Sequence, residues 1–386
     1  MLKNKTTFYL IYLFAFFWSL SMALPSYIQS SFLGQFVKIE LIGLYIVLST
    51  IVTLIFLFFF PRIIKKFRNY QVTLFLVGLG VIATASLAFV QSWWLVLIFF
   101  ILHFLILNVI AINLDVFLEI ISEDEHTGHI RTTFLTIANS AWVIAPLIMG
   151  YLTQNNKYWV VYLASAIVLA PVLIILILTK RNMKDRVNYE NRNFKQLTVF
   201  LRKNKNIKAI LKVAFILRFF YCLMVLYTPI YLHEYIGFSW SEIGFIFTIM
   251  LMPFIIFQLP AGNLADRYFG EKEILVFGLV IMLTATGSIF FIQSASFLVW
   301  AAILFMTRVG ASLVEAMQDV YFFKQVDRQD MDLIDLFRNI RPIAWLAGSL
   351  FAVVVLKFFP IQYLFLFLAI AILIGLRSAL TLKDTK

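Results

Sequence analysis

The sequence predicts an all-α integral membrane protein with twelve transmembrane helices, arranged as two parallel repeats of six. Three observations lead to this prediction: the composition, the spacing of the apolar segments and an internal repeat. Of the 386 residues, 62% are hydrophobic and only 13% are charged, whereas a soluble domain is about half apolar and about a quarter charged. One or two buried cores cannot hold so large an apolar excess, so much of it must face lipid.

Apolar segments long enough to cross a bilayer recur along the whole chain. A helix needs about 20 mainly apolar residues to cross roughly 30 Å of hydrocarbon. It also satisfies its backbone hydrogen bonds internally, as lipid requires. By this criterion we expect helices at 6–28, 41–60, 72–90, 94–118, 132–153, 158–179, 209–232, 241–261, 274–293, 297–321, 334–357 and 361–380.

The basic residues are distributed unevenly between the loops. One set of loops includes a cluster at 62–68 and ten lysines and arginines from 180 to 208, whereas the opposite loops carry only Lys38, Lys157 and Lys357. Cytoplasmic loops are enriched in lysine and arginine. We therefore expect a multi-pass protein of the plasma (inner) membrane with both termini in the cytoplasm. The net charge of +12 then reflects orientation in the bilayer, and we expect no nucleic-acid partner.

One long polar segment divides the chain into three parts. We expect an N-terminal six-helix bundle at 1–179, a basic cytoplasmic linker at 180–208 and a C-terminal six-helix bundle at 209–386. The end of the linker mixes apolar and basic residues, so it either lies along the membrane surface or forms a solvated connector. The sequence leaves both alternatives open.

The two halves repeat with a shift of about 200 residues. Six-plus-six halves in parallel orientation are typical of transporters that rock one half against the other around a central binding site. The corresponding landmarks are Ile42-Gly43 with Ile243-Gly244, 61–69 with 262–270, Asp115 and Glu119 with Glu315 and Asp319, and Asn139 with Asn339.

The loop after the eighth span reads Leu259-Pro-Ala-Gly-Asn-Leu-Ala-Asp-Arg-Tyr-Phe-Gly-Glu-Lys272. It resembles the loop signature of the major facilitator superfamily, and the resemblance in hydropathy and topology covers nearly the whole chain. In the first half Lys65 stands where the signature has its aspartate. The resemblance implies a cytoplasmic gate motif that stabilises one access state, formed by Gly262, Asp266, Arg267, Gly270 and Lys272.

Each position of this gate motif has a physical reason. The two glycines allow close approach and positive φ in a short turn. Asp266 lies where a helix N-terminus favours negative charge, and Arg267 can donate hydrogen bonds to a neighbouring helix.

The fifth span contains a second, weaker motif, with Ala141, Ala145, Pro146 and Gly150. It is similar to the glycine–proline motif that family members exporting drugs by antiport carry, with two glycines replaced by alanine. Small residues allow close packing and proline bends a helix. The resemblance implies a helix-kink motif at Pro146 and Gly150, and an ordinary kinked span is the alternative.

Ionisable residues inside spans are costly, so they are functional candidates. Two carboxylate pairs, each four residues apart, lie on one face of their helices. Close carboxylates favour proton binding, so one interpretation is proton coupling; the other is ion pairing in the gate, with Arg131 or Arg338 as partners. The candidates for binding substrate or protons are Asp115, Glu119, Arg218, Arg308, Glu315 and Asp319.

The eleventh span begins with further charged residues. Asp335, Arg338 and Arg341 are spaced for ion pairs on one helix, so we expect them in the cytoplasmic gate and not in contact with substrate.

Together these features predict a secondary transporter that works by alternating access. We expect proton-coupled export of a small amphipathic compound; the alternative is an importer or facilitator of an organic anion, sugar or other nutrient. The expected partners are a small-molecule substrate, protons and the lipid bilayer, with the protein as a monomer. No nucleotide-binding or hydrolase motif is present, so we expect no enzymatic activity, no cofactor and no metal site. The single cysteine, Cys222, is expected to be a small packing residue.

Overall fold

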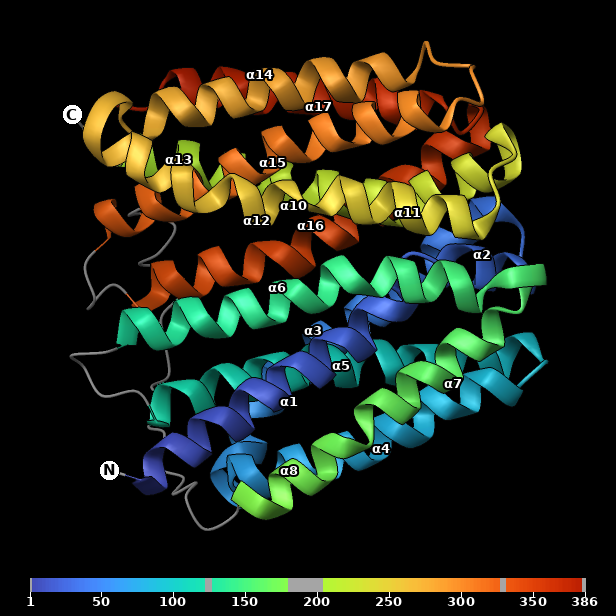
Figure 1. Ribbon diagram of the computed structural model, residues 1–386, viewed down its shortest axis with the longest axis vertical. Coiled ribbons are helices and arrows are strands. Elements are labelled where there is room, and N and C mark those ends of the chain that lie inside the picture. Colours follow the sequence, from blue (N-terminus) through green and yellow to red (C-terminus); the bar gives the residue numbers. More distant parts are fainter. Residues whose placement is uncertain (1, 122–126, 180–203, 327–330, 384–386) are drawn as a thin grey trace. The chain divides into compact units, whose positions relative to one another are not determined.

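The computed structural model describes residues 2–121, 127–179, 204–326 and 331–383. Every regular element in these ranges is helical (Figure 1). Eleven of the described helical segments are long and apolar enough to cross a membrane, and a shorter apolar helix, Thr136–Leu152, coincides with the predicted fifth span. The prediction of an all-α membrane fold is confirmed.

The chain folds into two compact units, residues 1–189 with 239–245 and residues 190–238 with 246–386. Residues 239–245 therefore group with the first unit, although they follow part of the second in sequence. The predicted domain limits, 1–179 and 209–386, remain a prediction.

The first unit contains most of the helices from the N-terminal half. α1 packs against α5, α6, α7 and α8, while α4 packs between α5 and α7. Its elements are α1 (Leu2–Ser26), α2 (Gln29–Gly34), α3 (Ile39–Phe67), α4 (Asn69–Phe89), α5 (Trp93–Ile121), α6 (Thr127–Leu152), η1 (Gln154–Asn156), α7 (Tyr158–Leu169) and α8 (Pro171–Thr179).

In the second unit α10 packs against α15, α16 and α17, and α14 runs beside α15 and α17 (Figure 1). Only the first residues of α11 belong to the first unit. The elements are α10 (Lys205–Ile230), η2 (Tyr231–Ile236), α11 (Trp240–Leu251), α12 (Pro253–Ile256), α13 (Gln258–Leu264), η3 (Ala265–Phe269), α14 (Glu271–Ile289), α15 (Phe297–Gln325), α16 (Met331–Phe358) and α17 (Tyr363–Leu380).

Proline and capping residues explain where the elements differ from the predicted spans. Two predicted spans are interrupted: α8 begins at Pro171 and α12 at Pro253. Proline lacks a backbone N–H and clashes with the preceding turn, so it favours the first turn of a new helix. Conversely, α10 begins at Lys205, inside the predicted linker, because the Asn204 side chain accepts a hydrogen bond from Ile207 N at 3.3 Å.

Polar side chains connect helices inside the first unit. Ser165 Oγ of α7 donates to the Ser21 carbonyl of α1 at 2.7 Å, and His103 Nδ1 of α5 lies 2.8 Å from Thr84 Oγ1 of α4. Trp18 Nε1 donates to the Leu107 carbonyl at 3.1 Å. Such interhelical hydrogen bonds stabilise packing where lipid provides no competing partner.

In the second unit, glycines allow helices to approach closely. A Cβ placed on Gly278 of α14 would lie 2.9 Å from the Gly310 carbonyl oxygen of α15, and one on Gly310 would lie 2.5 Å from the Gly278 carbonyl oxygen. Cys222 of α10 is fully buried, and its Sγ would be 2.9 Å from a Cβ on Gly348 of α16. Cys222 is therefore a packing residue, as the sequence predicted.

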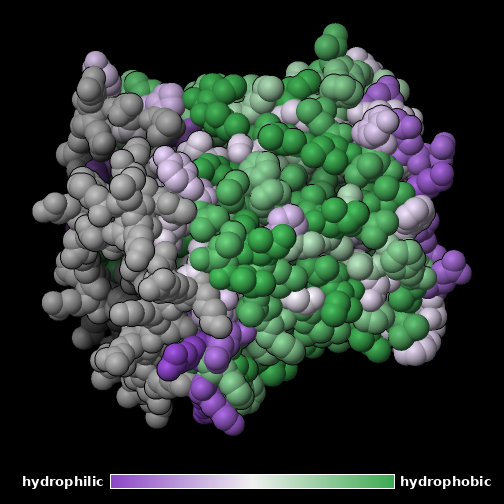
Figure 2. Space-filling view, turned by 60° about the horizontal axis from the view of Figure 1, so that its bottom comes forward, coloured by the Kyte–Doolittle hydropathy of each residue, from purple (hydrophilic) through white to green (hydrophobic). Residues whose placement is uncertain are grey.

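Hydrophobic residues cover the middle of the face shown in Figure 2, and hydrophilic residues gather towards its right-hand and lower edges. Large apolar side chains remain exposed on both units, among them Phe58, Phe75, Phe277 and Leu298. A soluble protein rarely exposes so many, so this surface is suited to contact with acyl chains.

We predict that Gly310→Ala destabilises the protein, because the new methyl group meets backbone atoms of α14 that cannot move aside. The free energy of unfolding should fall by about 1–3 kcal/mol, seen as a lower melting temperature in detergent. Gly78→Ala in α4 is the matched control: a Cβ there meets nothing within 4 Å, and alanine is a better helix former. Equal melting temperatures for the two variants would contradict the close α14–α15 packing.

Candidate functional site

An ion pair in the second unit joins α10 to α15. Arg218 lies near the middle of α10, and its Nη1 donates to Glu315 Oε1 at 2.7 Å. Tyr221, one turn further along α10, donates through its hydroxyl to Glu315 Oε2 at 3.3 Å. Both carboxylate oxygens of Glu315 are therefore held by α10, one of them through a charge-assisted hydrogen bond.

Two more charged side chains lie beside this pair. The Arg308 guanidinium is 4.9 Å from the Phe220 ring centre and 5.5 Å from that of Tyr221, which are favourable cation–π distances. Asp319 follows Glu315 by one helical turn and interacts electrostatically with Glu315 and Arg218. Its Oδ1 is buried and accepts no hydrogen bond from the described residues.

A third arginine joins the cluster from α16. Arg341 is exposed and is close enough to Arg218 and Glu315 to interact with them electrostatically; its role in the gate stays a prediction. With Glu315 and Asp319 ionised, three arginines against two acids give the cluster a formal net charge of +1. We call these five residues the α10–α15–α16 charge cluster: Arg218, Arg308, Arg341, Glu315 and Asp319.

The cluster is partly accessible. The Arg218 side chain is 25% exposed and that of Glu315 is 21% exposed, whereas Arg308 is only 1% exposed. The Arg218–Glu315 pair is therefore only partly buried, while Arg308 supplies a fixed positive charge beside it.

In the predicted gate loop, Gly270 has φ 88°, a conformation that glycine adopts at low cost. Gly262 shows neither expected feature, which corrects our expectation: its φ is not positive, and a Cβ there would meet nothing within 4 Å among the described residues. Lys272 is half-buried in the first turn of α14. The side chains of Asp266 and Arg267 lie outside the described residues, and their gate role stays a prediction.

The loop contains a residue that the sequence analysis missed. Glu271, directly after Gly270, is 1% exposed and forms an ion pair with Lys324 near the end of α15. A carboxylate in the first turn of α14 also faces the positive end of the helix. The available signal was a glutamate at a helix start, but an ion-pair partner 53 residues away cannot be read from local sequence.

The helix-kink motif lies in α6, which continues as a helix through Pro146. Gly150 packs closely on residues 239–245 of the same unit: a Cβ on it would be 2.6 Å from the Trp240 carbonyl oxygen and 3.1 Å from Gly244 Cα. The contact is therefore one of backbone on backbone, which only small residues allow.

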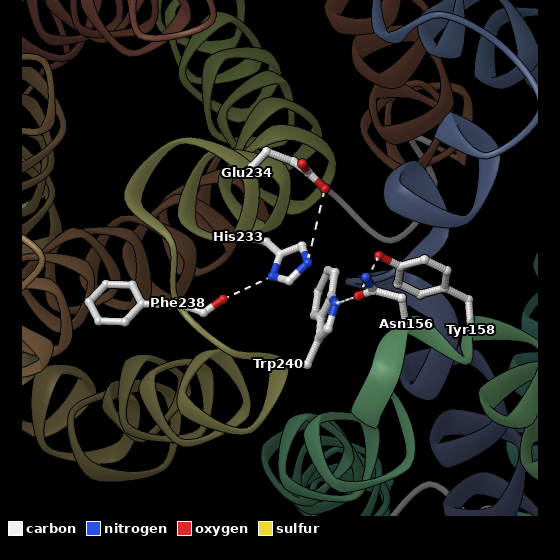
Figure 3. Close-up of polar contacts among 6 residues, drawn as sticks. All are labelled: Asn156, Tyr158, His233, Glu234, Phe238 and Trp240. Atoms are coloured by element: carbon white, nitrogen blue, oxygen red, sulfur yellow. Dashed lines mark hydrogen bonds and ion pairs between the residues drawn. The ribbon is translucent and has the colours of Figure 1, made fainter.

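Figure 3 shows two sets of polar contacts, one in each unit. Trp240 Nε1 donates to Asn156 Oδ1 at 2.9 Å, and the Trp240 ring is perpendicular to the Tyr158 ring at 5.5 Å. In the second unit, His233 Nδ1 lies 2.8 Å from the Phe238 carbonyl oxygen and its Nε2 lies 4.0 Å from Glu234 Oε1. His233 thus closes the turn after η2.

The side chains of Asp115, Glu119, Asp335 and Arg338 lie outside the described residues, so their roles stay predictions. Among the side chains that are described, no three His, Cys, Asp or Glu residues come together as a metal site.

Two buried polar residues in spans were also missed. His103 is 6% exposed in α5, and a histidine inside an apolar run was signal enough to find it. Gln318, three residues after Glu315, is fully buried beside Asp319.

A model of the "Major Facilitator Superfamily" matches residues 6–332 and, again, 221–385. This chain belongs to the major facilitator superfamily. It is a multi-pass membrane protein and a secondary transporter, not an enzyme. The comparison with curated proteins returned no match.

Solved structures share the fold of this transporter at low identity. A bacterial homologue of the iron transporter ferroportin, crystallised in an inward-facing state, has 15% identity and a TM-score of 0.74, with 98% of each chain covered. A bacterial metal transporter has 14% identity and a TM-score of 0.67, covering 98% of this chain and 97% of its own. At this identity the likeness establishes the fold alone.

We predict that Glu315→Ala destabilises the transporter more than the double substitution Arg218→Met/Glu315→Ala. Removing one partner leaves an unpaired guanidinium, which costs about 3–5 kcal/mol for a fully buried pair and less for this partly exposed one. Melting temperatures of the single variants, the double variant and the wild type in detergent form the test cycle. Strictly additive losses would show that the pair carries no coupling energy.

Proposed function

We propose that this transporter couples proton movement to the export of a small amphipathic compound, with Glu315 as the group that exchanges the proton. The observation that carries the proposal is that Glu315, 21% exposed, is bound by Arg218 at 2.7 Å and by Tyr221 at 3.3 Å. An acid that is both accessible and bound by a cation can change partners when it changes charge.

The chemistry follows from the two charge states of Glu315. As a carboxylate it holds Arg218 and Tyr221 and so ties α15 to α10. A proton on Oε1 removes the charge-assisted bond to Arg218 and releases a positive charge in a site of low dielectric. Two states of one interhelical contact thus differ by one proton, which is what a coupled transporter needs.

The surroundings of the cluster suit an amphipathic molecule. Tyr221 packs against Phe254 at 6.2 Å between ring centres, and the Arg308 guanidinium lies 4.9 Å from the Phe220 ring centre. Binding sites for organic molecules combine aromatic walls with a few polar groups that fix orientation.

A second candidate is transport of an organic anion. The three arginines of the cluster favour it, because they exceed its two acids by one charge. In this case the anion would take the place of Glu315 on Arg218, and proton binding to Glu315 would aid uptake of the anion by leaving Arg218 unpaired.

The two structural neighbours are a homologue of an iron transporter and a metal transporter, so a metal ion is a further cargo to include in the assays. Arg218 and Arg308 beside Glu315 oppose a divalent cation at this acid, because like charges repel. We therefore rank a metal ion below the two organic classes.

We predict that everted vesicles containing the wild type accumulate amphipathic dyes only with a proton gradient, and that Glu315→Gln lowers the rate at least tenfold because glutamine cannot exchange a proton. Glu273→Gln, an exposed acid in the first turn of α14, is the matched control and should keep the wild-type rate. The measurement is dye uptake with and without a protonophore.

Other outcomes assign the cargo differently. Uptake of an organic anion that requires Arg218 and Arg308, without dye movement, would support the second candidate. Uptake of Mn²⁺ or Fe²⁺ alone would replace both. An unchanged rate and unchanged protonophore sensitivity in Glu315→Gln would refute the role of this residue.

A further inference from the structure

A groove on the second unit lies apart from the charge cluster. It is about 530 Å³ in volume, and its walls come from the start of α10, the start of α16 and the end of α17. Its lining is almost entirely apolar, and Phe215, Ile216, Leu336, Ile340 and Ile374 form the walls. The groove is open to its surroundings, unlike a closed cavity in the core.

Basic residues stand at one end of this groove. Lys208 and Lys212 line it and are exposed. Together with Lys205 they are spaced i, i+3 and i+7, so they share one face of α10. The N-terminus of α10, at Lys205, adds the positive end of a 26-residue helix to the same region.

The lysines mark the edge of the hydrocarbon layer. α10 begins an apolar segment that is long enough to span a membrane, Lys205–Ile236. Lysines at the end of such a segment extend towards the headgroups, while their methylene groups stay on apolar surface. The groove below them therefore lies at the depth of acyl chains.

A ligand that fits this arrangement has an anionic head and an apolar tail. A neutral lipid would offer no negative charge to the lysines, and a free phosphate would leave the apolar walls exposed. Residues 180–203 of this chain are a poor occupant, because they carry eight lysines and arginines against two acids and the lysines would repel them.

We propose that this groove binds an anionic glycerophospholipid. Its phosphate contacts Lys208 and Lys212, and one acyl chain lies against Phe215, Ile340 and Ile374. Because α10 carries Arg218 two to three turns further along, a lipid here contacts the same helix that holds the charge cluster. The proposal concerns a lipid site and does not depend on the identity of the cargo.

The test is native mass spectrometry of the purified transporter, titrated with phosphatidylglycerol or phosphatidylcholine. We expect tighter binding of phosphatidylglycerol to the wild type. Lys208→Gln/Lys212→Gln should weaken it about tenfold or more, since each basic residue near an anionic lipid contributes measurably to binding. Lys357→Gln, at the last turn of α16, is the matched control and should bind like the wild type.

A second variant separates the tail from the head. Ile374→Trp fills the groove and should lower the binding of both lipids, whereas the lysine variant should lower only that of phosphatidylglycerol. Equal melting temperatures in phosphatidylcholine show that the variants are folded. Equal affinity of the wild type for both lipids, or competition by millimolar glycerol phosphate, overturns the proposal.

Discussion

A bilayer offers no hydrogen-bond partner to a buried polar group, and the whole structure depends on this constraint. It explains why the described backbone is helical, because a helix satisfies its own N–H and C=O groups. It also explains why polar side chains inside the spans reach across to a neighbouring helix, as Ser165 does to Ser21 and Arg218 to Glu315. The same requirement both assembles each unit and selects the residues available for function.

The two kinds of polar contact differ in what they can do. The Trp18 indole donates to a backbone carbonyl, a contact that carries no charge. The pair of Arg218 and Glu315 carries two opposite charges, and under the proposed function it changes when its acid gains a proton. Neutral contacts occur in both units, for example Trp18 with Leu107 in the first and Trp300 with Ser294 in the second, whereas the Arg218–Glu315 pair lies in the second.

The fold could be predicted from composition and hydropathy because the length of an apolar segment is a local property of the sequence. The predicted helix boundaries were less accurate where a single residue sets the start of a helix, as Pro171, Pro253 and Asn204 do. Helix-breaking prolines within apolar runs are visible in the sequence, but whether a bilayer span continues past one depends on packing by neighbouring helices.

The sequence allowed single site residues to be predicted, but not the contacts between them. Intramembrane charges such as Arg218 and Glu315 could be identified as candidates, because burying them is costly. Their pairing could not, since it joins positions 97 residues apart. Likewise the ion pair of Glu271 with Lys324 and the approach of Gly150 to Gly244 depend on how helices cross. The internal repeat related positions in the two halves of the sequence, but it did not indicate which side chains contact each other.

The protein contains a single cysteine, Cys222, and its thiol is fully buried where α10 and α16 cross. A thiol without access to solvent reacts slowly with maleimides and spin labels. The natural sequence therefore serves directly as an unlabelled background, into which pairs of cysteines can be introduced. Distances measured between one label on each unit would then follow the two halves through the cycle, without first removing a native residue.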